Sequence, residues 1–485
     1  MNSNLRFARV FRVCGWLLLL EALFLLLPMC VSLAYGEDDW WTFLAAAVSA
    51  GAVGGGAAYF LRGCPSRLNR LDAFLLTTMV WVLFSGFGMI PFMAGSLGAD
   101  AAGAFFETMS GFTTTGATVI ADVESQTRGL LFWRSLIQWI GGLGIVLFIL
   151  AVLPALNRDG GISMFNAEMT GISHDKLHPR IRQTAKSLWE VYGVLTAVLA
   201  LLLWLGPMDF FDSVCQSMTT MSTGGFSTRN DSIAGFGSRY VAAAVTLFML
   251  VGGVNFTLIY NMSRGDFSSL RRNTVVKVYA GTVAAIYAVL AVSLAFQGNE
   301  WDWTDFLLRP MFLIASAITT TGFSYGGFEA WGPVALTLVF VMMLTGACAG
   351  STTGAVKLDR FTALARHARN EVMLGLYPNR MMHVDVNGRM LNEGQMSRIY
   401  AFIVLYLALI LAGTLVLAAC GFSFTDSLFA TTSCIGNNGL GYGATGGSFS
   451  VIPSGAKWML SALMLVGRLE LFTVIALFIP SFWKK

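Results

Sequence analysis

The chain has 485 residues, of which 55% are hydrophobic and only 12% are charged, and its formal net charge is +4. A soluble globular domain carries about 25% charged residues, so this composition excludes a soluble protein. Many apolar stretches reach the roughly 20 residues that a helix needs to cross a bilayer. These stretches are continuous rather than alternating, which favours helices over a β-barrel. We therefore expect an all-α polytopic membrane protein.

Hydropathy predicts about ten full spans along the chain. Their approximate extents are 8–34, 41–61, 71–94, 129–156, 185–206, 238–262, 274–296, 331–370, 397–420 and 456–482. The first follows three arginines and could mimic a signal peptide. It is too long for one and is interrupted by Glu21, so we interpret it as a retained helix. The eighth is predicted to be interrupted near its middle.

Four shorter segments lie between spans and lead into polar, glycine-containing words. The segments are 101–112, 209–221, 304–318 and 424–434. The words are TTTGATV (113–119), STGGFST (222–228), TTTGFSYGG (319–327) and GNNGLGYG (436–443). At about a dozen residues each segment is too short to cross a bilayer, and such a length suits a re-entrant half-helix.

The same unit recurs four times. When Gly116, Gly224, Gly322 and Gly439 are aligned, a second glycine word follows each of them 24 to 28 residues later. These second words are IGGLG, VGGVN, TGACA and VGRLE. We therefore predict two extra N-terminal helices followed by four tandem repeats. The expected boundaries are 1–68 for the extension and 69–160, 180–265, 270–370 and 393–485 for the repeats.

Four half-helices that enter from one side can converge on a central axis with their negative dipole ends inward. Non-helical backbone at membrane depth must line a cavity or be buried in protein. Carbonyl oxygens from four such segments can replace the water shell of a cation, which predicts a monovalent-cation filter. Close helix packing is the alternative role for small residues, but packing does not explain why each word follows a segment too short to span. The candidate filter residues are Thr114, Thr115, Gly116, Ala117, Ser222, Thr223, Gly224, Gly225, Thr320, Thr321, Gly322, Phe323, Asn437, Asn438, Gly439 and Leu440.

The eighth span contains TGACAGSTTGAVK (345–357), whose glycines and hydroxyl residues weaken a helix. We interpret this stretch as unwound, the alternative being a glycine-softened packing helix. The candidate residues of this stretch are Gly346, Ala349, Gly350, Ser351, Thr352, Thr353 and Gly354.

Arg468 is the only basic residue deep in a predicted span, and an intramembrane charge is a functional hypothesis by default. By repeat alignment Arg468 matches Gly142, Gly253 and Ala347. If these positions face the axis, Arg468 repels cations there and can donate hydrogen bonds to carbonyls of the unwound stretch. The alternative is a structural ion pair, for which Glu470 is poorly placed because residues i and i+2 do not share a helix face.

Lys and Arg residues concentrate in loops on one side of the predicted spans, including both termini. The positive-inside rule makes this side cytoplasmic, so both termini are expected on the cytoplasmic side of the membrane.

Two rival functions were weighed. An intramembrane enzyme needs a catalytic constellation at membrane depth, and the sequence pattern supplies none. A secondary transporter for an organic solute predicts inverted repeats, whereas this unit recurs in one orientation. Whether the flux is channel-like or coupled to H⁺ or Na⁺ stays open.

The motifs SGFTTTGAT, MTTMSTGGFST, ITTTGF, GNNGLG, CAGSTTGAVKLDR and VGRLELFT resemble those of the Trk/Ktr/HKT superfamily of potassium transporters, specifically its bacterial TrkH type. The resemblance covers essentially the whole chain. It implies a pseudo-fourfold pore in each protomer, a homodimer in the lipid membrane, and K⁺ as the transported ion with no organic cofactor. It also implies one filter glycine per repeat, an intramembrane loop at 345–357 that obstructs the pore, and docking of a cytosolic TrkA-type nucleotide-binding ring by the basic segment 357–398. Asn437 and Asn438 depart from the threonine pattern, which predicts an asymmetric filter.

Overall fold

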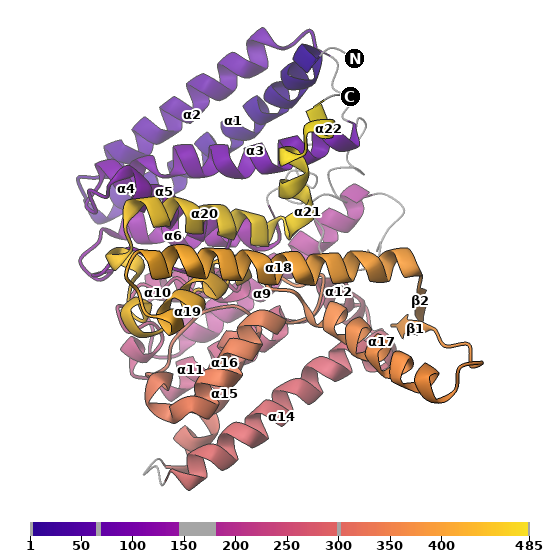
Figure 1. Cartoon of the computed structure of the whole chain (residues 1–485). Helices are drawn as coiled ribbons and strands as arrows, with labels where there is room; N and C mark the ends of the chain where they lie inside the picture. Colours follow the sequence, from indigo (N-terminus) through magenta and orange to yellow (C-terminus); the bar gives the residue numbers. More distant parts are fainter. Residues whose placement is uncertain (1–2, 65–68, 145–180, 298–301, 484–485) are drawn as a thin grey trace.

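The computed structural model describes residues 3–64, 69–144, 181–297 and 302–483, and these residues are almost entirely helical (Figure 1). Two N-terminal helices, α1 (Ser3–Tyr35) and α2 (Trp40–Phe60), pack against each other as a hairpin. The hairpin contacts the first repeat through α3 (Arg70–Gly88) and α6 (Arg128–Gly142). The predicted two-helix extension is therefore confirmed.

The four repeats follow in chain order. The first comprises α3 (Arg70–Gly88), α4 (Ile90–Ala94), α5 (Ala101–Phe112) and α6 (Arg128–Gly142). The second comprises α9 (Ile181–Leu205), α10 (Phe210–Met221), α11 (Arg239–Gly252), α12 (Phe256–Ser263) and α13 (Phe267–Arg272). The third comprises α14 (Thr274–Phe296), α15 (Trp303–Ile318), α16 (Gly332–Thr345) and α17 (Leu358–Leu376). The fourth comprises α18 (Glu393–Ala419), α19 (Phe424–Gly436), α20 (Ser454–Arg468), α21 (Glu470–Ile475) and α22 (Pro480–Trp483).

A small hairpin that the sequence analysis did not predict joins the third and fourth repeats. Its strands β1 (Val384–Val386) and β2 (Arg389–Leu391) pair antiparallel. Asn387 and Gly388 form the turn at φ of 56° and 76°, the left-handed conformation that two-residue hairpin turns require. The hairpin falls within the basic segment 357–398.

The predicted half-helices are α5, α10, α15 and α19. Each begins at a side chain that accepts a hydrogen bond from a backbone N–H of the first turn: Asp100, Asp209, Asp302 and Ser423. The backbone amide of Asp305 and the hydroxyl of Thr304 hold the pKa of Asp302 down to about 2, so this cap is charged and favours the helix dipole. At 12 to 16 residues these helices are about 18–24 Å long, shorter than the bilayer core.

The repeats close into a ring through their second helices. Helix α6 packs against α5 and α10, and α11 packs against α10 and α15. Helix α16 packs against α15 and α19, and α20 packs against α19 and returns to α5. The first helices α3, α9, α14 and α18 each pack on the half-helix of their own repeat. This arrangement places four half-helices around one axis.

Among the described residues, seven helical stretches are long and apolar enough to span a membrane, and two bent helix pairs raise the number to nine. The predicted span 129–156 is described only as far as residue 144, so its second half lies outside the described residues. The predicted interruption of the eighth span is confirmed, because α16 ends at Thr345 and α17 begins at Leu358.

Two spans predicted to be continuous are broken. The chain bends by 102° between α11 and α12. It bends by 110° between α20 and the stretch Glu470–Phe478. Asn255 starts the new helix α12 by accepting a hydrogen bond from the amide of Thr257, and Glu470 takes a left-handed φ of 53°. Both breaks fall within the second glycine word of their repeat, so the word marks a helix end rather than a point inside a span.

Candidate functional site

Each half-helix ends in the same backbone conformation. A non-glycine residue takes a left-handed φ of 50° to 55°, and the glycine two positions later takes a φ of 81° or 82°. The pairs are Thr114 and Gly116, Thr223 and Gly225, Thr320 and Gly322, and Asn437 and Gly439. Four segments with one conformation confirm that the unit repeats at the level of the backbone. We call residues 114–117, 222–225, 320–323 and 437–440 the candidate filter.

In the second repeat the equivalent glycine is Gly225, and the alignment on Gly224 was wrong by one residue. Gly225 has the left-handed φ of 81° that Gly116, Gly322 and Gly439 share. Gly224 instead precedes it and matches Thr115 of the first repeat. Two adjacent glycines make the register ambiguous in sequence, and only the dihedral angles distinguish them.

The four glycines and the residues before them form a closed ring. A Cβ added to Gly116 would meet the carbonyl group of Gly224 in the next repeat. The same relation holds from Gly225 to Thr321, from Gly322 to Asn438 and from Gly439 back to Thr115. Each repeat thus brings one backbone carbonyl against the glycine of its neighbour, at an approach that only glycine permits. A ring of backbone oxygens is the chemistry that replaces the hydration shell of a cation.

The side chains behind the ring differ between repeats. In the first and third repeats a threonine pair is hydrogen-bonded, Thr113 to Thr115 at 2.8 Å and Thr319 to Thr321 at 2.7 Å. In the fourth repeat the Asn437 amide instead donates to Thr115 Oγ1 at 3.0 Å and to the Met464 carbonyl at 2.9 Å. The ring is fourfold in its backbone and asymmetric in the side chains that support it.

A cavity of about 490 Å³ opens on one side of the ring. Gly116, Gly225, Gly322 and Gly439 all line it, together with residues of the loops that follow the filter words. Every repeat therefore contributes its glycine to the floor of one shared vestibule.

On the other side of the ring lies the unwound stretch between α16 and α17, residues 346–357, which we call the intramembrane loop. Its Gly354 N–H donates to Thr320 Oγ1 at 2.8 Å, and its Ala355 N–H donates to the Gly436 carbonyl at 2.9 Å. Thr352 contacts the second repeat, where its Oγ1 lies 3.2 Å from Thr223 Oγ1. The loop is thus tied directly to the ends of three half-helices.

The opposite edge of the loop is bound to the break between α11 and α12. Asn255 Nδ2 donates to the Ala349 carbonyl at 2.9 Å, and the Phe256 N–H donates to the Gly350 carbonyl at 3.0 Å. Gly350 has a φ of 76°, and a Cβ there would collide with the Asn255 side chain. The sequence analysis missed Asn255; the signal was present, because an asparagine immediately before an apolar segment, here the one that begins at Phe256, is a helix-start pattern.

Arg468 reaches the intramembrane loop from the fourth repeat. Its Nη1 donates to the Thr352 carbonyl at 2.9 Å, and its Nη2 donates to the carbonyls of Gly141 at 2.6 Å and Gly142 at 2.5 Å. One guanidinium therefore joins the helix breaks of the first, third and fourth repeats. Glu470 pairs with Arg360 at 2.6 Å, in agreement with the expectation that it is a poor partner for Arg468.

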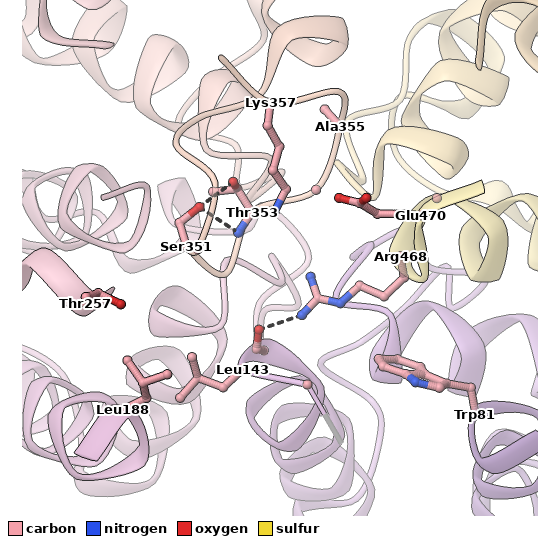
Figure 2. A pocket seen from close by; sticks show the side chains of 15 residues that line it. Trp81, Leu143, Leu188, Thr257, Ser351, Thr353, Ala355, Lys357, Arg468 and Glu470 are labelled. Carbon is pink, nitrogen blue, oxygen red and sulfur yellow. Dashed lines mark hydrogen bonds between the residues drawn. The ribbon is translucent and has the colours of Figure 1, made fainter. Parts of the chain in front are cut away.

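A cavity of about 50 Å³ lies beside these contacts. Figure 2 shows Arg468 and Glu470 entering it from one side, while Ser351, Thr353 and Lys357 come from the loop. Because Thr320 contacts the loop from the filter side, the loop separates this inner cavity from the ring of glycines.

A second arginine is buried in protein near the start of the predicted span 129–156. Arg134 lies in the second turn of α6, is only 2% exposed, and bonds to Glu107 at 2.9 Å.

Comparisons with known proteins agree with this architecture. The model of the TrkH family, described as a cation transport protein, matches residues 43–272 and 303–485. The Trk system potassium uptake protein TrkG of Escherichia coli is 34% identical, with 98% of each chain covered, and the TrkH of the same organism is 31% identical over 99% of this chain and its own full length. The crystal structure of the potassium transporter TrkH from Vibrio parahaemolyticus superposes with a TM-score of 0.89 at 29% identity, covering 98% of this chain and 99% of that one. This chain, with its four-repeat helical ring, is a multi-pass membrane protein that belongs to the TrkH family of cation transport proteins.

Proposed function

We propose that this protein mediates potassium uptake, with the ring of four glycines as its selectivity filter. The observation that carries the proposal is the recurrence of one backbone conformation, φ of 81° or 82° at Gly116, Gly225, Gly322 and Gly439, around a shared vestibule. The similar proteins whose names specify potassium uptake support K⁺ as the ion. An inside-negative potential contributes about 2.3 kcal/mol per charge per 100 mV, enough to drive inward flux.

The intramembrane loop acts as the gate beneath this filter. It lies between the ring and the inner cavity, and Arg468 holds it through the Thr352 carbonyl. The guanidinium also places a permanent positive charge on the cation pathway. Opening requires the loop to move away from the axis and the bonds of Arg468 to break or rearrange.

A cytosolic nucleotide-binding subunit of the TrkA type controls this gate, and two copies of the chain form the membrane unit in a bacterial inner membrane. The basic loops on one side of the spans support a cytoplasmic position for both termini. Segment 357–398 contains α17 and the β1–β2 hairpin, and α17 follows the intramembrane loop directly. A partner that pulls on α17 therefore acts on the gate with no intervening element.

The test is uptake of radiolabelled Rb⁺ by a bacterial strain that lacks its own potassium importers. Cells that express the chain with a TrkA-type partner are expected to accumulate Rb⁺ and to grow at low K⁺, and excess K⁺ should block uptake better than excess Na⁺. The matched control is Gly225→Ala, which changes one filter residue. Absence of Rb⁺ uptake by membrane-inserted wild-type protein would contradict the proposal.

A further inference from the structure

A buried ion pair between Glu107 and Arg134 lies behind the backbone that follows the first filter segment, on the side of the vestibule. Glu107 is on half-helix α5 and is fully buried, and Arg134 is on α6 and is 2% exposed. Arg134 Nε donates to Glu107 Oε1 at 2.9 Å. A buried pair of this kind is weak evidence for stability, because desolvation offsets most of the attraction. Its position suggests another role.

The Glu107 carboxylate receives donors from the backbone segment that leaves the ring. Thr118 Oγ1 donates to it at 2.9 Å, and the Val119 N–H donates to Oε2 at 2.8 Å. Both residues follow Gly116 within three positions. Charge-assisted hydrogen bonds are about twice as strong as neutral ones, so the carboxylate fixes the direction in which the first filter segment ends.

Arg134 extends the same restraint to the second repeat. Its Nη1 donates to the Ser227 carbonyl at 3.1 Å, and its guanidinium carbon lies 4.1 Å from the centre of the Phe226 ring. Ser227 and Phe226 directly follow Gly225. One turn further along α6, Gln138 donates to the Gly224 carbonyl at 2.6 Å and accepts from the Phe226 N–H at 3.1 Å. Two neighbouring filter segments are thereby fixed to one helix.

Among the described residues, this pair is absent from the aligned positions of the later repeats. The second repeat instead uses Asp212 on α10, which accepts from Thr228 Oγ1 at 2.7 Å and pairs with Arg229 at 3.1 Å. Nine residues before the filter glycine, the later repeats carry Gln216, Leu313 and Ala430 in place of Glu107. Seven residues before the first glycine of the second glycine word, they carry Val245, Val339 and Leu460 in place of Arg134. Gln216 keeps a neutral version of the contact, since its Nε2 donates to Ser227 Oγ at 2.7 Å.

We propose that Glu107 and Arg134 are a positioning pair that sets the spacing of the first two filter segments and hence the preference for K⁺ over Na⁺. The proposal rests on the filter assignment made above. Glu107 has a second effect, because Arg134 also lines the outer vestibule and its charge would repel entering cations if it were not neutralised. Neither residue needs to contact the ion.

The test compares two matched changes in the full chain, reconstituted in lipid vesicles. Glu107→Gln and Asp72→Asn each remove one carboxylate charge from a buried ion pair, but Asp72 pairs with Arg6 and Arg9 at the start of α3, away from the ring. Radiolabelled Rb⁺ uptake is measured against competing K⁺ and Na⁺. Glu107→Gln is expected to lower the K⁺-over-Na⁺ ratio about tenfold, equivalent to about 1.4 kcal/mol, while Asp72→Asn leaves it unchanged.

Thr118→Val keeps both charges. It removes only the Thr118 hydroxyl, which bonds to Glu107 and Arg134 just after the first filter segment. It decides the question if Glu107→Gln fails to give monodisperse protein, and it is expected to lower the ratio about threefold, since one hydrogen bond is lost. A ratio within twofold of wild type in folded Glu107→Gln and Thr118→Val, or an equal fall in Asp72→Asn, overturns the positioning role. A wild-type protein without any K⁺ preference would instead refute the potassium filter itself.

Discussion

Replacing Arg468 by alanine is expected to raise ion flux, because two restraints on the pathway disappear together. The first restraint is mechanical: the guanidinium donates to the Thr352 carbonyl at 2.9 Å and to the Gly141 carbonyl at 2.6 Å, which holds the intramembrane loop against the first repeat. A hydrogen bond to a charged group is worth about 1.5–3 kcal/mol. The second restraint is electrostatic, since the guanidinium stays protonated at any physiological pH.

The magnitude follows from Coulomb's law. A cation that passes about 5 Å from the guanidinium, at an effective dielectric constant near 20, meets a repulsion of roughly 3 kcal/mol. Water in the inner cavity and the negative ends of the half-helices reduce this value. A net barrier change of about 1.4–2.7 kcal/mol is the upper expectation, which corresponds to a ten- to hundredfold rise in flux.

The assay is Rb⁺ uptake into vesicles that contain purified Arg468→Ala, Arg468→Lys or wild-type protein, with and without the regulatory partner. Lysine keeps the charge but lacks the planar fork that bonds two carbonyls at once, so it should retain most of the barrier. Arg62→Ala is the matched control, because Arg62 is an exposed arginine just after α2 and lies outside the basic segment 357–398. If flux falls in both Arg468 variants although they fold, the residue is a structural support and its axial role is refuted.

Three further outcomes follow from the same geometry. Gly116→Ser should weaken K⁺ selectivity, because a side chain is strained at a φ of 82° and its Cβ meets the Gly224 carbonyl; an unchanged K⁺/Na⁺ permeability ratio in well-expressed protein would remove Gly116 from the filter. Deleting Gly350–Thr353 should raise flux without altering selectivity, and reduced flux from folded protein would identify the loop as packing. Gly225→Ala should lower the K⁺/Na⁺ ratio more than Gly224→Ala, because the added Cβ meets backbone in the first case and the movable Gln138 side chain in the second; the reverse order would restore the original alignment.

Hydropathy and length were sufficient to predict most of the fold. The four half-helices were found because each is an apolar segment too short to cross a bilayer. The breaks after α11 and α20 were not found, since both halves of each bent span are apolar and hydropathy carries no information on direction. The left-handed conformation of Glu470 and the helix start at Asn255 are local backbone features, and hydropathy averaged over a window does not detect them.

The candidate site was predicted in its parts but not in its register or its supports. Composition located all four filter words, yet it could not choose between Gly224 and Gly225, because the choice depends on which glycine meets the Thr321 carbonyl of the next repeat. Glu107 and Arg134 are 27 positions apart and lie on different helices, so no spacing rule joins them. The contacts between repeats form only when the chain folds into the ring, so the spacing of residues along the sequence does not reveal them.

The differences between the repeats explain how a fourfold ring can accommodate the single gate proposed above. The described second helices all end at the same landmark. Among the segments that the structure describes, only the third repeat has a 12-residue loop there, and only the fourth has an arginine at this position. These two exceptions meet, through Arg468 Nη1 and the Thr352 carbonyl. Four identical subunits would have to bring four loops and four guanidinium groups to one axis, where the like charges would repel one another. Covalent linkage of the repeats removes this conflict, because each can keep the filter backbone while diverging in what lies beneath it.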